Sequence, residues 1–249
     1  MLILLPPSET KRPGGSKQPL DLTRLSYSSL TSQREAVIES LVALSDDPRR
    51  AARVLKLGPK QIVEVAVNAQ LRESLTMPAV DRYTGVLFDA LDASTLDGVS
   101  RRWLGAHVRI HSAPFGPIGA LETIPSYRLG AAASLPGIPS LKRVWAEAVS
   151  AAISQDGPRF VLDMRSEAYV ALGPVPATVP SVYVRVVSHT AEGEVRALNH
   201  FNKHAKGALV RLLATSRPRV STLTGFMRWA ESAGVQMRVS NGNEVLLIV

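Results

Sequence analysis

The chain has 249 residues and no cysteine, and its 29 Lys and Arg outnumber its 21 Asp and Glu, giving a formal net charge of +8. Without cysteine, disulfides, thiolate nucleophiles and cysteine-ligated zinc or iron–sulfur clusters are excluded. The positive charge favours polyanionic partners: nucleic acid first, then anionic lipid or a phosphorylated small molecule. The apolar opening of five residues is too short for a signal peptide, and no segment approaches a membrane span. We therefore expect a soluble, cytoplasmic chain forming one domain over residues 1–249, with no membrane contact.

The first third of the chain is predicted to begin with a buried strand at residues 2–5, because these residues are all apolar and Pro6 and Pro7 follow them. Helices are predicted next, from Thr31 or Ser32 to about 44, from 46–48 to about 57, and from 60 to about 74. Gly58 and Pro59 form a tight turn between the last two helices. This outline is that of a helix-hairpin-helix, whose turn amides can hold a phosphate. A plain helical hairpin has the same outline and is the more frequent explanation.

The middle of the chain is predicted to alternate helix and strand. A short helix from Ser94 or Thr95 to Trp103 is followed by a strand at 107–112. A second glycine-containing turn, within 134–145, leads into a helix that ends near 154. Residues 159–164 then read as another buried strand, so polar loops alternate with apolar strands as in α/β proteins.

The last third is predicted to hold two hairpins and two helices. Apolar and polar residues alternate over 182–190, and the chain turns back to form a second strand at 195–198. The second hairpin pairs 235–239 with 244–249 across an Asn-Gly turn. Helices at 200–213 and 222–233 lie between the two hairpins. The whole pattern predicts a mixed α/β fold with a central mixed sheet surrounded by helices and a helix-hairpin-helix-like element.

The helix predicted at 200–213 separates apolar from cationic positions. Ala205 and Leu209 recur on one face, while three cations occupy other positions: Lys203, Lys206 and Arg211. Gly207 costs about 1 kcal/mol relative to alanine inside a helix, which is tolerated where a ligand phosphate or a neighbouring strand must approach closely. Residues 185–238 hold nine basic and three acidic residues, so +6 of the net +8 lies there. An ordinary solvated helix face is the alternative.

Polar residues are predicted to gather in the loops at the strand ends, where open α/β sheets bind ligands. These residues are Ser8, Lys11, Glu122, Tyr127, Arg128, Ser166, Glu167 and Tyr169. Together they suit a cationic pocket for a nucleotide or base, and equally a structural polar network. His200 and His204 share one helix face and His107 and His111 one strand, but two ligands make no metal site. Neither a Gly-x-Ser-x-Gly elbow nor a dinucleotide fingerprint is present, so we expect no metal and no cofactor.

Five segments follow one another along the chain: MLILLPPSETK, YTG from Tyr83, RIHSAPFGPIGALETIPSYRLG, DMRSEAY and HFNKHAKGALVR. They occur in the order found in the YaaA family of peroxide-stress proteins, which the chain resembles over nearly its whole length. The resemblance implies a cytoplasmic bacterial protein made under hydrogen peroxide, which limits iron-driven oxidative damage. It also implies DNA binding through a positively charged cleft and a helix-hairpin-helix element.

Several family positions are altered in this chain. The family's Leu-Ser-Gly-Leu-Tyr-Gly loop is here 111–116, its Arg-Pro pair is Gly119-Ala120, and two family glutamates are replaced by Gly130 and Ala168. Loss of an arginine and two carboxylates counts more against catalysis than against binding. We therefore expect binding of double-stranded or structured DNA through phosphate contacts of Lys203, Lys206 and Arg211, with Lys11 and Arg128 lining the same cleft. Because nothing in the sequence signals an interface, we expect a monomer. The alternative is an enzyme acting on a nucleotide, nucleobase or modified DNA.

Overall fold

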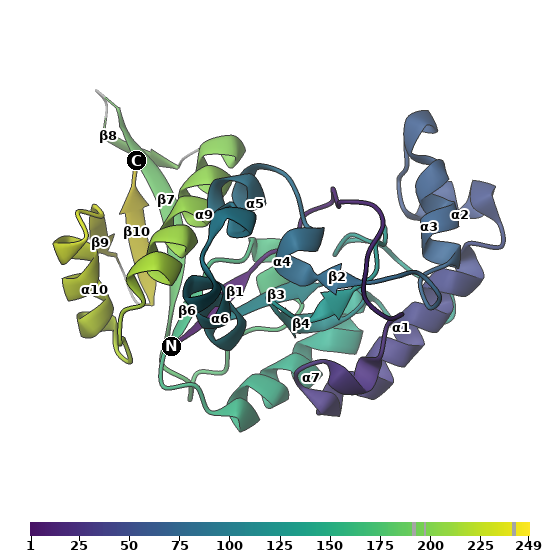
Figure 1. Cartoon of the computed structure of the whole chain (residues 1–249), viewed down its shortest axis with the longest axis horizontal. Helices are drawn as coiled ribbons and strands as arrows, with labels where there is room; N and C mark the ends of the chain where they lie inside the picture. The colour runs from purple at the N-terminus through teal and green to yellow at the C-terminus, as the bar shows by residue number, and fades with distance from the viewer. Residues whose placement is uncertain (191–192, 197, 241–242) are drawn as a thin grey trace.

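The computed structural model describes residues 1–190, 193–196, 198–240 and 243–249 (Figure 1). Its strands are β1 (Leu2–Leu5), β2 (Met77–Pro78), β3 (Val108–Ser112), β4 (Gly116–Gly119), β5 (Thr123–Ile124), β6 (Val161–Asp163), β7 (Ser181–Thr190), β8 (Gly193–Arg196), β9 (Met237–Val239) and β10 (Glu244–Ile248). Its α-helices are α1 (Thr31–Leu44), α2 (Pro48–Val54), α3 (Val63–Ala69), α4 (Ala79–Arg82), α5 (Val86–Leu91), α6 (Gly98–His107), α7 (Leu141–Asp156), α8 (Glu167–Val170), α9 (Asn199–Ser216) and α10 (Leu223–Ser232). Short 3-10 turns are η1 (Leu22–Arg24), η2 (Ser28–Leu30), η3 (Pro59–Gln61) and η4 (Ala93–Thr95).

The main sheet is mixed and mostly parallel, with the order β4-β3-β1-β6-β7-β10-β9 and β8 paired to β7. Strands β3, β1, β6, β7 and β10 run parallel, while β4, β8 and β9 are antiparallel additions. Strand β1 lies in the middle of the fold, with Ile3 opposite Val108 on one side and Leu162 on the other. All four β1 side chains are buried because both faces of the sheet are covered, which accounts for its continuous apolar run.

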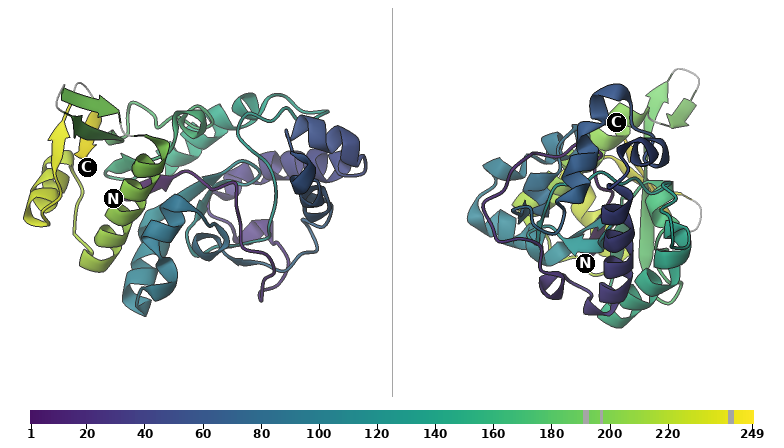
Figure 2. Two further views of the ribbon diagram at one scale, coloured as in Figure 1. Left: turned by 90° about the horizontal axis from the view of Figure 1, so that it is seen from above. Right: turned by 90° about the vertical axis from the view of Figure 1, so that its right-hand side faces the viewer.

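Helices cover both faces of the sheet. Helices α5, α6 and α9 lie on one face and α7 on the other, as the view from above shows (Figure 2). Helices α1, α2 and α3 lie together at one end of the long axis, and α10 with β9 lies at the opposite end (Figure 1). Across the described residues, no helix has both the length and the apolar character needed to cross a bilayer.

Most predicted elements are confirmed, and the helix starts follow capping side chains. Asp47, Asp97, Ser140 and Thr222 accept hydrogen bonds from the first turns of α2, α6, α7 and α10. The two predicted hairpins are present as β7–β8 and β9–β10, while their turns at 191–192 and 241–242 lie outside the described residues.

Three predicted boundaries are wrong. The helix expected over 60–74 is reduced to α3, preceded by the separate turn η3, since β-branched Val63, Val65 and Val67 disfavour a long helix. The helix expected from Ser94 or Thr95 begins instead after Asp97, the residue that caps it. His107 ends α6 and does not share strand β3 with His111. The helix-hairpin-helix assignment of α2 and α3 stays a prediction.

Candidate functional site at the carboxyl end of the sheet

Parallel strands β1, β3 and β6 end at one edge of the sheet, and the residues that follow them carry polar side chains. Lys11 lies on the loop after β1, Ser112 ends β3, and Arg165 follows β6. Lys11 also forms an isolated antiparallel bridge with Tyr83, which holds the β1 loop against the segment after α4. This is the edge of an open α/β sheet at which ligands bind.

The Lys11 amine lies against two phenol rings. Its Nζ donates hydrogen bonds to the carbonyl oxygens of Ser8 at 3.0 Å and Glu9 at 3.1 Å. It lies 4.0 Å from the ring centroid of Tyr127 and 5.5 Å from that of Tyr83. Burial first, and then the positive charge of Arg128, lower the pKa of Lys11 from 10.5 to about 7. At neutral pH, a substantial fraction of this amine is therefore uncharged.

Three buried hydroxyls lie beside the amine. The Tyr83 and Tyr127 hydroxyls are 2.7 Å apart, and Ser112 Oγ donates to the Tyr127 hydroxyl at 3.1 Å. Burial raises the pKa values of both tyrosines, so their phenols stay neutral at physiological pH. The cluster therefore offers neutral hydrogen-bonding groups to whatever meets the Lys11 amine.

Arg128 holds the two carboxylates that act on Lys11, those of Glu9 and Glu64. Its Nη2 lies 3.0 Å from Glu9 Oε2, and its Nε lies 3.6 Å from Glu64 Oε2 on α3. Asn68 of α3 fixes the Arg128 backbone by two hydrogen bonds. Arg128 thus ties the loop of Lys11 to α3.

A second polar network lies behind the edge, centred on the fully buried Arg165. Its guanidinium contacts both Asp163 carboxylate oxygens, at 2.9 and 2.6 Å, the Gly173 carbonyl at 2.8 Å and His111 Nδ1 at 2.8 Å. Because arginine only donates, Nδ1 accepts and the imidazole proton sits on Nε2. Burial, and then Arg165, keep the pKa of His111 well below 6.5, so the ring is neutral. Among the described residues, His111 Nε2 has no hydrogen-bond partner.

The structure brings part of the predicted pocket together. Ser8, Lys11, Tyr127 and Arg128 meet at the carboxyl edge, and the Tyr169 ring lies 5.9 Å from His111 behind it. Ser166 is exposed as the N-terminal cap of α8, and the neighbouring Glu167 lies 3.7 Å from Arg185.

Glu122 lies elsewhere in the fold. It accepts hydrogen bonds from the Ser26 amide at 2.8 Å, the Ser26 hydroxyl and the Gly119 amide at 2.9 Å. Strand β4 runs antiparallel to β3, so the loop after it returns to the amino end of the parallel strands. The prediction that Glu122 joins the other pocket residues is therefore wrong.

Helix α9 does not present its three predicted cations on one outer face. Lys203 is exposed, but Lys206 is only 4% exposed and its Nζ lies 5.2 Å from the Tyr183 ring centroid. Arg211 donates to the carbonyls of Leu91 at 2.9 Å and Asp92 at 2.8 Å, which satisfies the end of α5. The predicted outer cationic face is therefore wrong for Lys206, because α9 is sandwiched between α5 and the sheet.

Gly207 is needed for helix packing. A Cβ atom at this position would stand 2.1 Å from the Leu87 carbonyl oxygen of α5. The close approach predicted from the sequence is real, but the neighbour is a helix, not a ligand phosphate or a strand.

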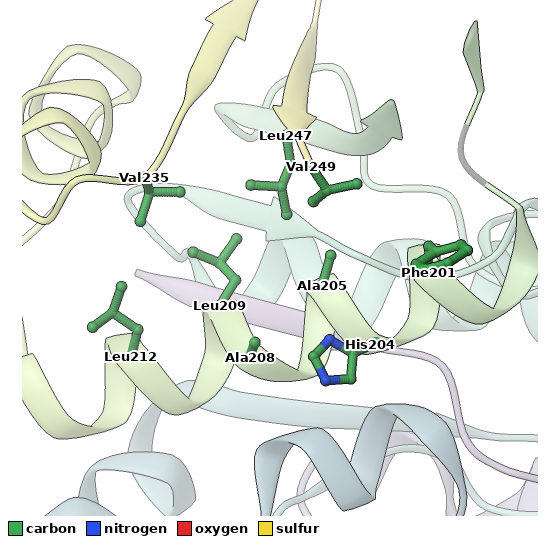
Figure 3. Close-up of a pocket in the computed structure, with 9 residues that line it drawn as sticks. All are labelled: Phe201, His204, Ala205, Ala208, Leu209, Leu212, Val235, Leu247 and Val249. Carbon is green, nitrogen blue, oxygen red and sulfur yellow. The ribbon is translucent and has the colours of Figure 1, made fainter. Parts of the chain in front are cut away.

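A further face of α9 lines an apolar pocket of about 300 Å³. Figure 3 shows side chains of α9, among them Ala205 and Leu209, facing Leu247 and Val249 at the end of β10. Phe201 at its rim is 60% exposed. His204 also lines this pocket, and no group of three potential metal ligands gathers anywhere in the described part of the chain.

The sequence interpretation missed a cluster of exposed cations on α2, its C-terminal turn and η3. We call it the hairpin surface: Arg49, Arg50, Arg53, Lys56 and Lys60, all exposed. Within the described residues, none of the five forms an ion pair. A signal was present, since five of the twelve residues at 49–60 are basic and none is acidic.

Comparisons with known proteins show which proteins this chain is similar to. The family described as peroxide stress protein YaaA matches residues 1–234. A UPF0246 protein of Corynebacterium efficiens is 43% identical, with 99% of this chain and 98% of the relative aligned. One of Corynebacterium glutamicum is 41% identical over the full length of both chains, and one of Streptomyces coelicolor is 39% identical over 86% of this chain and 84% of its own.

Proposed function

Because the chain belongs to the peroxide stress protein YaaA family, we propose that it is a cytoplasmic DNA-binding protein of the peroxide-stress response that limits iron-driven oxidative damage. The observation that carries the DNA-binding part is the hairpin surface. Five exposed cations within twelve residues give a strong local positive field at one end of the molecule (Figure 1). Such a field attracts the phosphate backbone without reading sequence.

The side chains next to the hairpin surface extend it toward the sheet. Arg128 contacts Glu64 of α3 on one side and Glu9 of the Lys11 loop on the other. We assign Arg128 and Lys11 to the inner wall of the DNA-binding cleft. On α9, we assign a separate phosphate contact to the exposed Lys203, while Lys206 and Arg211 position the helix.

Fluorescence anisotropy on a labelled duplex across a salt series tests the proposal. A variant with Arg49→Gln, Arg53→Gln and Lys60→Gln loses three charges from the hairpin surface. We expect its affinity to fall and the slope of log affinity against log salt to decrease by about 2 to 3, since each phosphate contact contributes about 0.9. The control variant carries Arg102→Gln, Arg219→Gln and Arg228→Gln together. These arginines are also exposed but lie away from the hairpin surface, on α6, just before α10 and on α10 respectively.

The comparison of the two variants decides the proposal. If both triple variants lose affinity equally, only net charge matters and the hairpin surface is not the DNA site. If the wild-type protein does not bind the duplex at low salt, the DNA-binding proposal fails altogether. A Lys203→Gln variant measured alongside tests the separate contact assigned to α9.

A second candidate function is an enzyme acting on a nucleotide, nucleobase or modified DNA. It is supported by the Lys11 amine lying against Tyr127 and Tyr83 at the carboxyl edge of the sheet. A thermal-shift screen with nucleotides and free bases is the direct test. Stabilisation by one compound, lost in Arg128→Ala, favours this function, and no shift with any compound argues against it.

A further inference from the structure

The hydrogen-bond acceptors of the Lys11 amine are neutral. Its Nζ hydrogen bonds are to two backbone carbonyls, those of Ser8 and Glu9, and within the described residues it has no carboxylate as an ion-pair partner. A neutral amine has two N–H donors and one lone pair. The two carbonyls therefore use both donors of the neutral form and leave its lone pair for another atom.

Arg128 favours the neutral form of the Lys11 amine. The carboxylates of Glu9 and Glu64 would otherwise favour a charged Lys11, but Arg128 binds both. The charged groups acting on Lys11 are Arg128 and Arg82, which lower its pKa, and Glu64 and Glu9, which raise it. The facing phenols of Tyr83 and Tyr127 stay neutral. Burial is the largest cause of the shift and the arginines add to it, so the pKa falls to about 7.

Lys11 lies close to the proposed DNA-binding surface. Glu64 belongs to α3, which contacts α2 and η3 of the hairpin surface, so the contacts of Arg128 tie the Lys11 loop to the helix next to that surface. A neutral lysine amine is a nucleophile for carbonyl carbon. Intact DNA offers only the amide-like carbonyls of its bases, which resist amines. A deoxyribose that has lost its base opens to a C1′ aldehyde, which reacts readily.

We propose that Lys11 is a nucleophile that forms an imine with the C1′ aldehyde of a base-free deoxyribose in DNA. This inference rests on the proposed DNA binding and names the chemistry of the same cleft. In the first step, the Nζ lone pair forms a bond to C1′, and the carbonyl π electrons move to oxygen, which takes a proton from the nitrogen. The resulting carbinolamine loses water as the C=N bond forms. The overall change is amine plus aldehyde to imine plus water, which needs no other reagent.

Borohydride trapping tests the proposal on the full chain. A duplex with one base-free site is incubated with the protein, and borohydride delivers hydride to the imine carbon, giving a stable secondary amine. We expect a covalent protein–DNA adduct that peptide mass spectrometry maps to Lys11. Lys11→Met should abolish the adduct, whereas Lys17→Met, an exposed lysine on the same loop, should leave its yield unchanged.

Arg128→Gln separates chemistry from folding. Releasing Glu9 and Glu64 favours the charged amine, so trapping at pH 7 should slow by about tenfold for each unit by which the pKa of Lys11 rises. Raising the pH to 9 should restore the rate. A variant that was only misfolded would not recover in this way.

The outcomes distinguish this inference from DNA binding itself. Normal binding of an undamaged duplex without any adduct overturns the inference and leaves the proposed function standing. An adduct that persists in Lys11→Met assigns the reaction to another amine and also overturns it. Where duplex binding is absent, 2-deoxyribose 5-phosphate serves as a small aldehyde probe. Its borohydride-dependent attachment to Lys11 supports the amine chemistry, and its failure to attach removes that support.

Discussion

The Asn68 side chain and the Arg128 backbone form a closed pair of hydrogen bonds. Asn68 Oδ1 accepts from the Arg128 amide at 2.7 Å, and Asn68 Nδ2 donates to the Arg128 carbonyl at 2.9 Å. Asn68 is fully buried on α3, the helix that packs against α2 of the hairpin surface, so this pair joins α3 to the segment that contains Tyr127 and Arg128. The two sides of the proposed cleft are therefore joined by the Asn68 side chain as well as by the ion pairs of Arg128.

Asn68→Ala should destabilise the protein. The substitution leaves the Arg128 amide and carbonyl without their partner, and an unsatisfied buried group costs about 1–3 kcal/mol. We expect the free energy of unfolding, measured by urea denaturation, to fall by that amount. Gln70→Ala, at an exposed position at the end of α3, is the control and should change it by less than about 0.5 kcal/mol. Equal losses in the two variants would show that the pair does not hold α3.

Lys56→Gly should raise stability while weakening DNA binding. Lys56 has φ 54° in the turn that ends α2, where Leu57 donates to the Ala52 carbonyl at 2.8 Å. A non-glycine residue in this conformation costs about 1–2 kcal/mol, and glycine costs about 0.5–1 kcal/mol in chain entropy. We therefore expect a net gain of about 0.5 kcal/mol in the free energy of unfolding, with lower affinity for a duplex in the anisotropy assay.

Lys56→Gln is the matched variant for this test. It removes the charge but keeps the strained backbone, so it should weaken DNA binding without the gain in stability. If Lys56→Gly binds DNA as tightly as the wild-type protein, the cation is not a phosphate contact. The strained lysine would then have no role in binding.

Local sequence patterns predicted where helices and strands lie better than they predicted which side chains are exposed or lie close together in the fold. The apolar run at residues 2–5 and the capping residues fix strands and helix starts through neighbours in sequence. Lys206 shows the limit, because its spacing matches an outer helix face but α9 is covered on two sides. Glu122 shows another, because the antiparallel return of β4 carries it away from the other pocket residues.

The central contacts of the candidate site depend on long-range pairs. Lys11 meets Tyr127, Arg128 meets Glu64, and His111 meets Arg165 across separations that no spacing rule encodes. The family resemblance supplied the order of these segments but not their distances. The hairpin surface is present in the sequence as a local run of basic residues, but that run does not show that all five side chains are exposed together without an ion-pair partner among the described residues.

Gly207→Ala should be strongly destabilising. Its Cβ would stand 2.1 Å from the Leu87 carbonyl oxygen and 2.9 Å from Ala90 Cβ, so α5 and α9 would have to separate. We expect a loss of about 3 kcal/mol or more in the free energy of unfolding. Gly98→Ala is the control, since its nearest neighbour is the flexible end of Arg102 at 3.4 Å, and there the change should be neutral or slightly stabilising. A tolerated Gly207→Ala would mean that α5 and α9 are not in close contact.

Lys11 should make stability depend on pH between about 7 and 10.5. Its pKa is about 7 in the folded chain and 10.5 ordinarily, so between these values the unfolded chain binds more protons at this residue. The free energy of unfolding should then rise with pH across this window, and below pH 7 the cost of burying the charged amine is fully present. Urea denaturation at several pH values measures this rise. It should be smaller in Lys11→Met and unaffected in Lys17→Met. A rise that is the same in all three proteins would show that Lys11 titrates normally, and the neutral amine required for imine formation would be absent at pH 7.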